Sequence, residues 1–447
     1  MKKKVKIIIV ILVLIILIGI SIYFIKNKYD KEEFQNTMND NSNSKTCIVL
    51  NSSDVITLEC EDNVIYKINL ENKYEVGNIL KITYEDEFLI DNFLKTEKLK
   101  SYNYLADDGI FKEYYDKALK KLKSMTIDEK IGQILLARTS DINQVKDLTT
   151  YKFGGYLLFK RDFTDKTKEE VIDMIKKYQD SSKIPMLIAA DEEGGIVSRI
   201  SSNRNLVDTP FKSPRALYLE GGLDRIKEDT IYKNEILASL GINLNLAPVV
   251  DVSTDESDYM YKRSIGLDAD LTSEFAKVVI EASKDSNVSY CLKHFPGYGN
   301  NSDTHIGLSY DTRSLESIKE IDLKPFIAGI DVGAEAVLVS HNIVSSIDNE
   351  NPASISESVH NLLRSDLSFT GIVITDDLSM KAIDDYYKNE AVINAINSGN
   401  DLLIVSDYKN TVKEIKEGLE YNKLSENILN KRVLRILAWK YYKGLIK

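Results

Sequence analysis

From about residue 110 to the C-terminus, short apolar runs alternate with longer stretches whose apolar residues recur at helical spacing. The amphipathic stretches include 168–179, 271–284 and 318–330, where the apolar positions would line one face of a helix. The short runs have the length and composition of buried parallel strands. These runs are 131–137, 155–159, 186–190, 244–250, 289–292, 336–339, 371–374 and 402–405. Eight strands alternating with helices predict an α/β fold, a (β/α)8 TIM-type barrel over residues 110–447.

Polar residues follow nearly every one of these runs. The C-terminal ends of barrel strands converge on one rim, where active sites are built, so we expect these side chains to lie together. A loop charge or a helix cap would explain any one of them, but less readily eight in register. The residues are Arg138, Arg161, Asp191-Glu192-Glu193, Asp251, Lys293-His294, Ser340-His341, Asp376-Asp377 and Ser406-Asp407.

N-terminal to the barrel, residues 46–100 have a different pattern of apolar and polar residues. Short β-rich runs at 47–50, 55–60, 64–70 and 79–84 are separated by polar turn segments. This pattern predicts a small all-β domain of four or five strands. It carries no group of residues with evident chemistry, so we interpret it as a spacer or a weak binding module.

The N-terminus begins with Lys2, Lys3, Lys4 and Lys6, and residues 7–25 then carry no charge. A helix over this run would span about 28 Å at about 1.5 Å per residue, close to the hydrocarbon thickness of a bilayer. A cleaved signal peptide is the alternative, but its apolar region would be shorter and would end in a small-x-small site. We predict a single-pass transmembrane anchor at 1–27.

The four leading lysines would keep the N-terminus in the cytoplasm and place the rest of the chain outside the cell membrane. Residues 28–45 are polar and predict a flexible linker between the anchor and the β domain. The catalytic domain is therefore expected to be extracytoplasmic, with the cytoplasmic membrane as a partner of the N-terminal helix.

Charge and cysteine content narrow the possibilities further. The chain has 58 basic and 69 acidic residues, a formal charge of −11, which argues against nucleic acid as a partner. Three cysteines cannot form a disulfide framework. Cys47 and Cys60 could pair in an oxidising compartment or remain two thiols, whereas Cys291 lies in an apolar run and is expected in the core.

The first cluster with candidate chemistry directly follows the run at 186–190. Asp191, Glu192 and Glu193 precede two glycines, which let the backbone turn tightly beneath a ligand. Asp191 could accept hydrogen bonds from sugar hydroxyls, and Arg199 could donate them. Alone the signal is weak, because acids before Gly-Gly also form ordinary turns.

The second cluster joins Lys293 and His294 to a Gly- and Pro-rich loop that contains Asp303 and His305. An aspartate two positions before a histidine can accept its ring N–H, which would orient the ring and raise its pKa toward the working pH of a general acid/base. A metal site is the rival interpretation. It would need three convergent ligands, and no His-x-x-x-His or Cys/His spacing is present, so we predict no metal.

The third cluster is the run 371–374, which leads into Asp376 and Asp377. Successive strand side chains face opposite ways, so only one of the two acids can point fully into the rim. A carboxylate there, with a proton donor across the sugar ring, is the minimum set for retaining glycoside hydrolysis.

Together the three clusters resemble those of glycoside hydrolase family 3, and most closely its bacterial single-barrel β-N-acetylglucosaminidase (β-N-acetylhexosaminidase) branch. The resemblance covers roughly residues 115–445. Residues 362–379 follow the family signature of an aliphatic pair, Arg and an acid, then Gly, three aliphatics, Ser or Thr, and the nucleophilic Asp. The Lys-His-Phe-Pro-Gly run with Asp-x-His after it is characteristic of the branch.

The resemblance implies a catalytic nucleophile, Asp376, and an acid/base, His305, paired with Asp303; Asp377 is not the nucleophile. Substrate contacts carry over onto Asp191, Arg199, Arg263, Lys293 and His294. The implied reaction is a double displacement that releases terminal β-linked GlcNAc through a glycosyl-aspartate, with no metal or organic cofactor. The expected substrate partner is a GlcNAc-containing glycan or muropeptide from peptidoglycan.

The chain departs from the branch at two positions. The branch usually has Arg after Gly-Gly, where this chain has Ile196, and His-Gly after Phe-Pro-Gly, where it has Tyr298 and Gly299. These positions bear on subsite preference rather than on reaction type. Other hypotheses remain: a β-glycosidase of another sugar preference, a phosphorylase, a non-catalytic wall-binding barrel, and a scaffold in which the β domain does the work.

Overall fold

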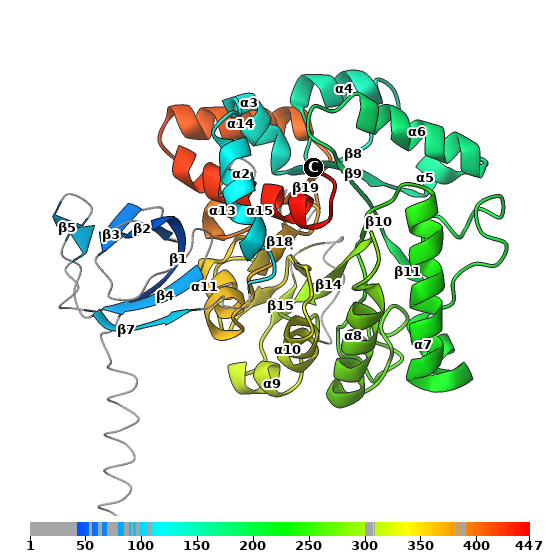
Figure 1. Cartoon of the computed structure of the whole chain (residues 1–447). Helices are drawn as coiled ribbons and strands as arrows, with labels where there is room; N and C mark the ends of the chain where they lie inside the picture. The colour runs from blue at the N-terminus through cyan, green and yellow to red at the C-terminus, as the bar shows by residue number, and fades with distance from the viewer. Residues whose placement is uncertain are drawn as a thin grey trace, which may run out of the picture.

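The computed structural model describes residues 43–52, 56–60, 65–68, 79–84, 89–90, 93–94, 99–104, 109–299, 307, 309–380, 383 and 390–447. A small β-sheet is followed by a larger α/β unit in which helices surround parallel strands (Figure 1).

Eight parallel strands form the barrel and confirm the predicted (β/α)8 architecture. In spatial order they are β18 (Ile372–Thr375), β16 (Ala336–Val339), β14 (Ser289–Phe295), β13 (Leu244–Asn245), β10 (Leu187–Ala190), β9 (Gly155–Leu158), β8 (Leu135–Arg138) and β19 (Leu403–Val405). Leu403 of β19 pairs with Leu135 of β8, and a single bridge between Ile374 and Leu402 joins β18 to β19. The barrel is therefore nearly closed, with its seam between β18 and β19.

Helices and short strands fill the connections between the barrel strands. The α-helices are α2 (Tyr115–Leu122), α3 (Ile127–Gln133), α4 (Gln144–Tyr151), α5 (Lys160–Phe163), α6 (Lys168–Asp180), α7 (Pro214–Ser239), α8 (Ala269–Ser283), α9 (Leu315–Glu320), α10 (Leu323–Asp331), α11 (Glu357–Asn361), α13 (Ala391–Ser398), α14 (Tyr408–Glu420) and α15 (Glu426–Tyr442). The other elements are the 3-10 helices η2 (Lys112–Tyr114) and η3 (Ala353–Ile355), the π-helical turn η4 (Leu362–Asp366), and the strands β11 (Glu192–Gly194), β12 (Val197–Ser198), β15 (Tyr310–Asp311) and β17 (Ile343–Val344).

Helix α6 illustrates how local sequence defines these elements. The Thr167 side chain accepts the N–H of Glu170, and the Glu170 carboxylate accepts the N–H of Thr167, which satisfies two unpaired donors at the helix start. Such a cap stabilises a helix by about 1 kcal/mol. Val171, Ile175 and Tyr178 are the buried residues of α6, and their i, i+4, i+7 spacing gives the helix one core-facing stripe.

Strand β13 is shorter than the expected run 244–250, and β14 is longer than the run 289–292. Two other expected elements each divide into two. The apolar run 131–137 divides into the end of α3 and strand β8, and Thr126 and Glu129 form a capping box that starts α3. The amphipathic stretch 318–330 divides into α9 and α10. In the first case the C-terminal half of α3 is buried throughout, so its residues share the apolar character of the strand that follows.

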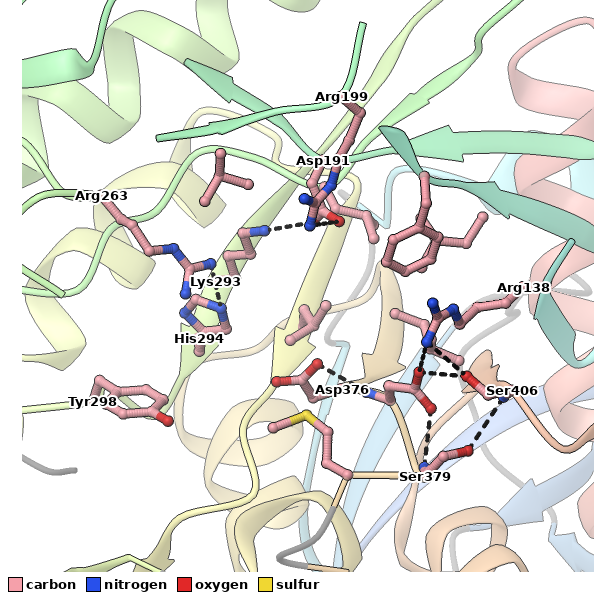
Figure 2. A pocket seen from close by; sticks show the side chains of 18 of the residues that line it. Arg138, Asp191, Arg199, Arg263, Lys293, His294, Tyr298, Asp376, Ser379 and Ser406 are labelled. Atoms are coloured by element: carbon pink, nitrogen blue, oxygen red, sulfur yellow. Dashed lines mark hydrogen bonds and ion pairs between the residues drawn. The ribbon is translucent and has the colours of Figure 1, made fainter. Parts of the chain in front are cut away.

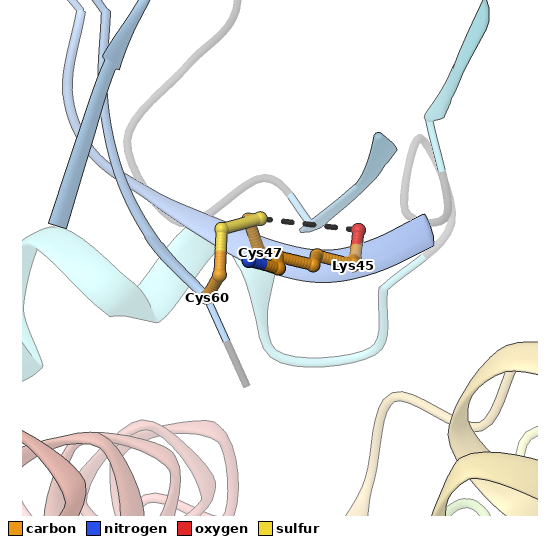
Figure 3. The surroundings of a disulfide bond; sticks show 3 residues. All are labelled: Lys45, Cys47 and Cys60. Atoms are coloured by element: carbon orange, nitrogen blue, oxygen red, sulfur yellow. Dashed lines mark hydrogen bonds between the residues drawn. A yellow bond between two sulfur atoms is a disulfide. The ribbon is translucent and has the colours of Figure 1, made fainter. Parts of the chain in front are cut away.

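The small sheet has strand order β5-β6-β3-β2-β1-β4-β7, so seven strands are described rather than four or five. They are β1 (Asn43–Ser52), β2 (Ile56–Cys60), β3 (Ile65–Ile68), β4 (Ile79–Tyr84), β5 (Leu89–Ile90), β6 (Phe93–Leu94) and β7 (Leu99–Tyr104). Cys47 of β1 lies directly opposite Cys60 of β2, and the two form a disulfide (Figure 3). Both cysteines are buried, as are Val49, Leu58 and Leu80, so one face of the sheet is apolar.

The predicted transmembrane helix requires a correction to the fold class. No helix within the described residues combines the length and the apolar character needed to cross a bilayer. Residues 1–27, on which that expectation rested, lie outside the described residues, as do most of the predicted linker residues 28–45. The fold that the structure supports is a nearly closed parallel barrel preceded by a small β-sheet.

Candidate active site

A cavity of about 730 Å³ opens at the C-terminal ends of the barrel strands (Figure 2). Its volume falls within the range of small-molecule sites in proteins. The strand-end residues expected to meet at this rim include seven that line it: Arg138, Asp191, Lys293, His294, Asp376, Asp377 and Ser406. The predicted convergence of these side chains is thus what the structure shows.

The three consecutive acids after β10 have three different environments. Asp191 lines the cavity, where its carboxylate lies 2.9 Å from Lys293 Nζ and 3.4 Å from Arg199 Nη2. Glu192 is fully buried and accepts the backbone N–H groups of residues 199–201, which fixes the turn that carries Arg199. Glu193 is buried behind the residues that line the cavity.

Glu193 holds two of the cations that face the cavity. Its carboxylate accepts two hydrogen bonds from Arg263, at 2.7 and 3.0 Å, and lies 2.7 Å from Lys293 Nζ. The Glu193 and Lys293 side chains are only 1% and 2% exposed, so neither charge could be buried alone without a large penalty. Burial raises the pKa of Glu193, but the Arg263 and Lys293 cations outweigh it and hold this pKa well below its usual range.

The same network keeps the cations charged. Burial lowers the pKa of Lys293, yet the carboxylates of Asp191 and Glu193 reverse the effect and raise it above the ordinary value. Lys293 therefore stays a cation that donates hydrogen bonds at neutral pH. Together, Asp191, Arg263 and Lys293 form a fixed set of acceptors and donors on one wall of the cavity.

His294 is oriented by a buried aspartate. Asp251 accepts the backbone N–H of His294 at 3.2 Å and lies 2.8 Å from its ring Nδ1, while its other oxygen accepts the N–H of Tyr298 at 2.8 Å. Because the carboxylate can only accept when ionised, Nδ1 carries the hydrogen. The other ring nitrogen, Nε2, lies 3.4 Å from Arg263 Nη2.

Asp376 follows β18 and lines the cavity. Its backbone N–H donates to Val339 O on β16 at 3.0 Å, and its Oδ1 accepts the N–H of Asp377 at 2.8 Å. Both acids line the cavity, but their carboxylates have different partners. The Asp377 carboxylate instead accepts hydrogen bonds from Ser406 Oγ at 2.8 Å and from the N–H of Ser379 at 2.9 Å.

The opposite wall contains a guanidinium stacked on an aromatic ring. Arg138 Cζ lies 4.0 Å from the centroid of the Phe159 ring, and Arg138 Nη1 donates to Ser406 Oγ at 3.3 Å. Figure 2 shows Asp376 between this wall and the wall formed by Arg263, Lys293 and His294.

The predicted site residues Asp191, Arg199, Arg263, Lys293, His294 and Asp376 all line this one cavity. His305 and Asp303 lie outside the described residues, so the structure does not place them. Two buried acids were not given roles from the sequence: Glu193, which sits inside the acidic cluster itself, and Asp251, which ends a predicted strand. Both acids closely follow a predicted barrel strand, and this position in the sequence could have indicated a role at the rim.

Arg161 and His341 follow barrel strands but do not line the cavity, and neither does His360. Arg161 pairs with Asp141 at 2.8 Å outside the cavity. His341 is fully buried between Ser354 and the Asp377 carbonyl. Burial lowers the pKa of His360, in α11, to about 4, so this ring is neutral in the core. Within the described residues no cluster of three or more His, Cys, Asp or Glu is arranged to hold a metal.

Comparison with known proteins agrees with this geometry. Residues 126–439 match the glycosyl hydrolase family 3 N-terminal domain. The chain is 32% identical over 235 residues to a β-hexosaminidase of Xylella fastidiosa (strain M23), covering 52% of this chain and 69% of the relative. It is 33% identical over 234 residues to a β-hexosaminidase of Xanthomonas campestris pv. campestris (strain B100), covering 51% and 69%.

Among solved structures, a glycoside hydrolase family 3 β-N-acetylglucosaminidase from Paenibacillus sp. str. FPU-7 superimposes with a TM-score of 0.68 at 28% identity. The match covers 72% of this chain and 63% of the Paenibacillus chain, less than two thirds of its length. The family match spans the barrel and every described residue that lines the cavity. The chain therefore belongs to glycoside hydrolase family 3 and is a glycoside hydrolase.

Proposed function

We propose that this enzyme is a retaining β-N-acetylglucosaminidase that removes terminal β-linked GlcNAc through a covalent glycosyl-aspartate. The observation that carries the proposal is the position of Asp376, a carboxylate on the rim of the nearly closed barrel that lines the same cavity as Asp191, Lys293 and His294. The relatives named β-hexosaminidases and β-N-acetylglucosaminidase support the choice of sugar.

The wall formed by Asp191, Arg263, Lys293 and His294 suits the hydroxyl groups of a pyranose. A hydroxyl both donates and accepts, and this wall offers a carboxylate acceptor beside cationic donors. Hydrogen bonds to charged partners are roughly twice as strong as neutral ones. Because these side chains are already fixed by Glu193 and Asp251, little ordering remains to be done when the sugar binds.

In the first step Asp376 attacks the anomeric carbon as the bond from that carbon to the leaving oxygen breaks. His305, in its protonated form and oriented by Asp303, gives its proton to that oxygen. In the second step the neutral His305 takes a proton from water, the water oxygen attacks the anomeric carbon, and the bond to Asp376 breaks. Two inversions release the sugar with its β configuration retained.

The proposed source of the substrate is peptidoglycan outside the cytoplasm. The disulfide between Cys47 and Cys60 supports this location, because disulfides form and persist in oxidising compartments and are rare in the cytosol. Muropeptides and other wall fragments with a terminal GlcNAc are the substrates to test first.

The direct test compares wild type and Asp376→Ala on an aryl β-N-acetylglucosaminide. We expect the variant to fold normally and to lose nearly all turnover, whereas Asp285→Ala, which changes an exposed acid that follows α8 and does not line the cavity, keeps it. Wild-type-like rates in Asp376→Ala would refute the assignment. Repeating the assay with and without phosphate separates hydrolysis from phosphorolysis, since only a phosphorylase yields a sugar 1-phosphate. Mass analysis of wall fragments then tests the source of the substrate.

A further inference from the structure

The strand that carries Asp376 stands at the seam of the barrel. On the side away from the seam, β18 pairs with β16 in regular register over four residues. The pairs run from Ile372 opposite Ala336 to Thr375 opposite Val339. Toward β19 it makes a single bridge, between Ile374 and Leu402. The strand that leads to the proposed nucleophile is therefore paired in regular register with β16, and is joined to β19 by a less regular set of bonds.

Backbone hydrogen bonds cross this seam at Val373 O, Leu402 O and Ile404 O. Side chains add further bonds to them. Asp401 Oδ2 accepts the N–H of Val373 at 3.0 Å, and Thr375 Oγ1 accepts the N–H of Ile404 at 3.0 Å. At the rim, the carboxylate of Asp377 accepts the hydroxyl hydrogen of Ser406 at 2.8 Å. Asp377, which makes this last bond, directly follows Asp376 in the chain.

The carboxylate and the carbonyl oxygen of Asp377 both have several partners. Its carboxylate binds Ser406 Oγ and the N–H of Ser379, and Arg138 Nη1 lies 3.9 Å from Oδ2 as a further cation. Its carbonyl oxygen lies 3.0 Å from His341 Nε2. A carbonyl only accepts, so Nε2 of His341 carries the hydrogen.

The third polar group of Asp377, its backbone N–H, donates to Asp376 Oδ1 at 2.8 Å. The direction of that N–H follows from the plane of the peptide between the two residues. This peptide is held on the Asp376 side by the bond to Val339 O and on the Asp377 side by the contacts above. The aim of the Asp376 carboxylate is thus tied to the contacts of its neighbour.

We propose that Asp377 is a positioning residue, which, through Ser406 and His341, fixes the N–H that orients the nucleophilic carboxylate of Asp376. The proposal rests on the proposed function, because it assumes that Asp376 attacks the sugar. It assigns a role to the second acid of the pair, which the resemblance to the family leaves without one. A displacement of about 1 Å at a reacting group can cost roughly 100-fold in rate, so small shifts of this peptide should be measurable.

The experiment measures how fast Asp376 is labelled by a 5-fluoro glycosyl fluoride of N-acetylglucosamine. With this reagent the glycosyl-enzyme forms faster than the glycosyl-enzyme is hydrolysed, so it accumulates. Asp377→Ala should label roughly 100-fold more slowly than wild type. Asp377→Asn keeps the volume and one acceptor and should lose less, as should Ser406→Ala, at roughly 10-fold.

Asp407→Asn is the matched control. It makes the same chemical change one residue beyond Ser406, where the exposed Asp407 only caps α14, and asparagine caps a helix equally well. Its labelling rate should equal that of wild type. The inhibition constant of free GlcNAc should stay within about threefold in all variants, because the proposed role of Asp377 is in aiming the nucleophile rather than in binding the sugar.

The outcomes separate this inference from the proposed function. Failure of the wild type to be labelled at Asp376 would contradict the proposed function itself. Labelling of the wild type and of Asp377→Ala at equal rates would overturn only the positioning role. A parallel rise of the GlcNAc inhibition constant in Asp377→Ala would make Asp377 a substrate contact and would also overturn it. Slow labelling with unchanged GlcNAc affinity supports the inference.

Discussion

Replacing Glu193 with glutamine tests the electrostatics beneath the cavity. The substitution conserves volume, so it opens no cavity in the core, but it removes the negative charge that lies between Arg263 and Lys293. Among the ion pairs of the described residues, Lys293 would keep only the one with Asp191, and the buried cations would outnumber their carboxylates. Removing one partner of a buried pair typically destabilises a protein by about 3–5 kcal/mol.

The magnitude expected at neutral pH is therefore a loss of about 3–5 kcal/mol in the free energy of unfolding. The single tryptophan, Trp439, is fully buried in α15 and donates from its ring nitrogen to Glu335, so its fluorescence reports unfolding of the barrel in urea. Asp141→Asn provides the control, because its pair with Arg161 is exposed and should contribute about 1 kcal/mol or less.

The loss should also depend on pH with a defined sign. The pKa of Glu193 is lower in the folded state than in the unfolded state, where it is about 4.3. Its stabilising contribution is fully present above that unfolded pKa and is lost as the pH falls through the folded pKa. The difference between wild type and Glu193→Gln should thus be constant from pH 8 to about 5 and shrink below about 4. A difference under about 1 kcal/mol at pH 7 would refute the proposed stabilisation of Arg263 and Lys293 by Glu193.

Three further predictions concern orientation, acid/base chemistry and the disulfide. Asp251→Ala should lower kcat/KM on an aryl β-N-acetylglucosaminide by roughly 10- to 100-fold, because His294 loses the carboxylate that orients its ring; an unchanged kcat/KM would argue against this role. His305→Ala should abolish nearly all turnover and Asp303→Ala should cost less, since the second removes orientation rather than the proton carrier; equal losses would contradict the distinction. Thiol titration of the oxidised, denatured chain should find one reactive cysteine, Cys291, and three after reduction; three without reductant would exclude the disulfide between Cys47 and Cys60.

Much of the barrel was predictable because its strands are buried on both faces and stand out as apolar runs. The run at 336–339 coincides with β16, and the runs at 155–159, 186–190 and 402–405 agree with β9, β10 and β19 to within a residue at each end. The run at 131–137 was misjudged because a buried helix end and a buried strand follow each other without a polar break. Thr126 and Glu129 at capping-box spacing were the available signal for that helix.

The cavity was predicted from strand ends, since polar residues placed there must converge when a barrel closes. The sequence could not predict which buried acids hold the side chains that line the cavity. Glu193 holds Arg263 and Lys293, and Asp251 orients His294. These pairs depend on tertiary contacts between segments far apart in the chain. The tie from Asp377 to Ser406 likewise exists only because β18 and β19 meet at the seam.

The stereochemistry of the first product tests the central claim most directly. Proton NMR of an aryl β-N-acetylglucosaminide, recorded within the first minutes of hydrolysis by the wild-type chain, distinguishes the two anomers of released GlcNAc before they interconvert. Attack by Asp376 followed by attack of water predicts β-GlcNAc as the first product. Initial release of α-GlcNAc would mean a single displacement by water and would contradict the role of Asp376 as nucleophile.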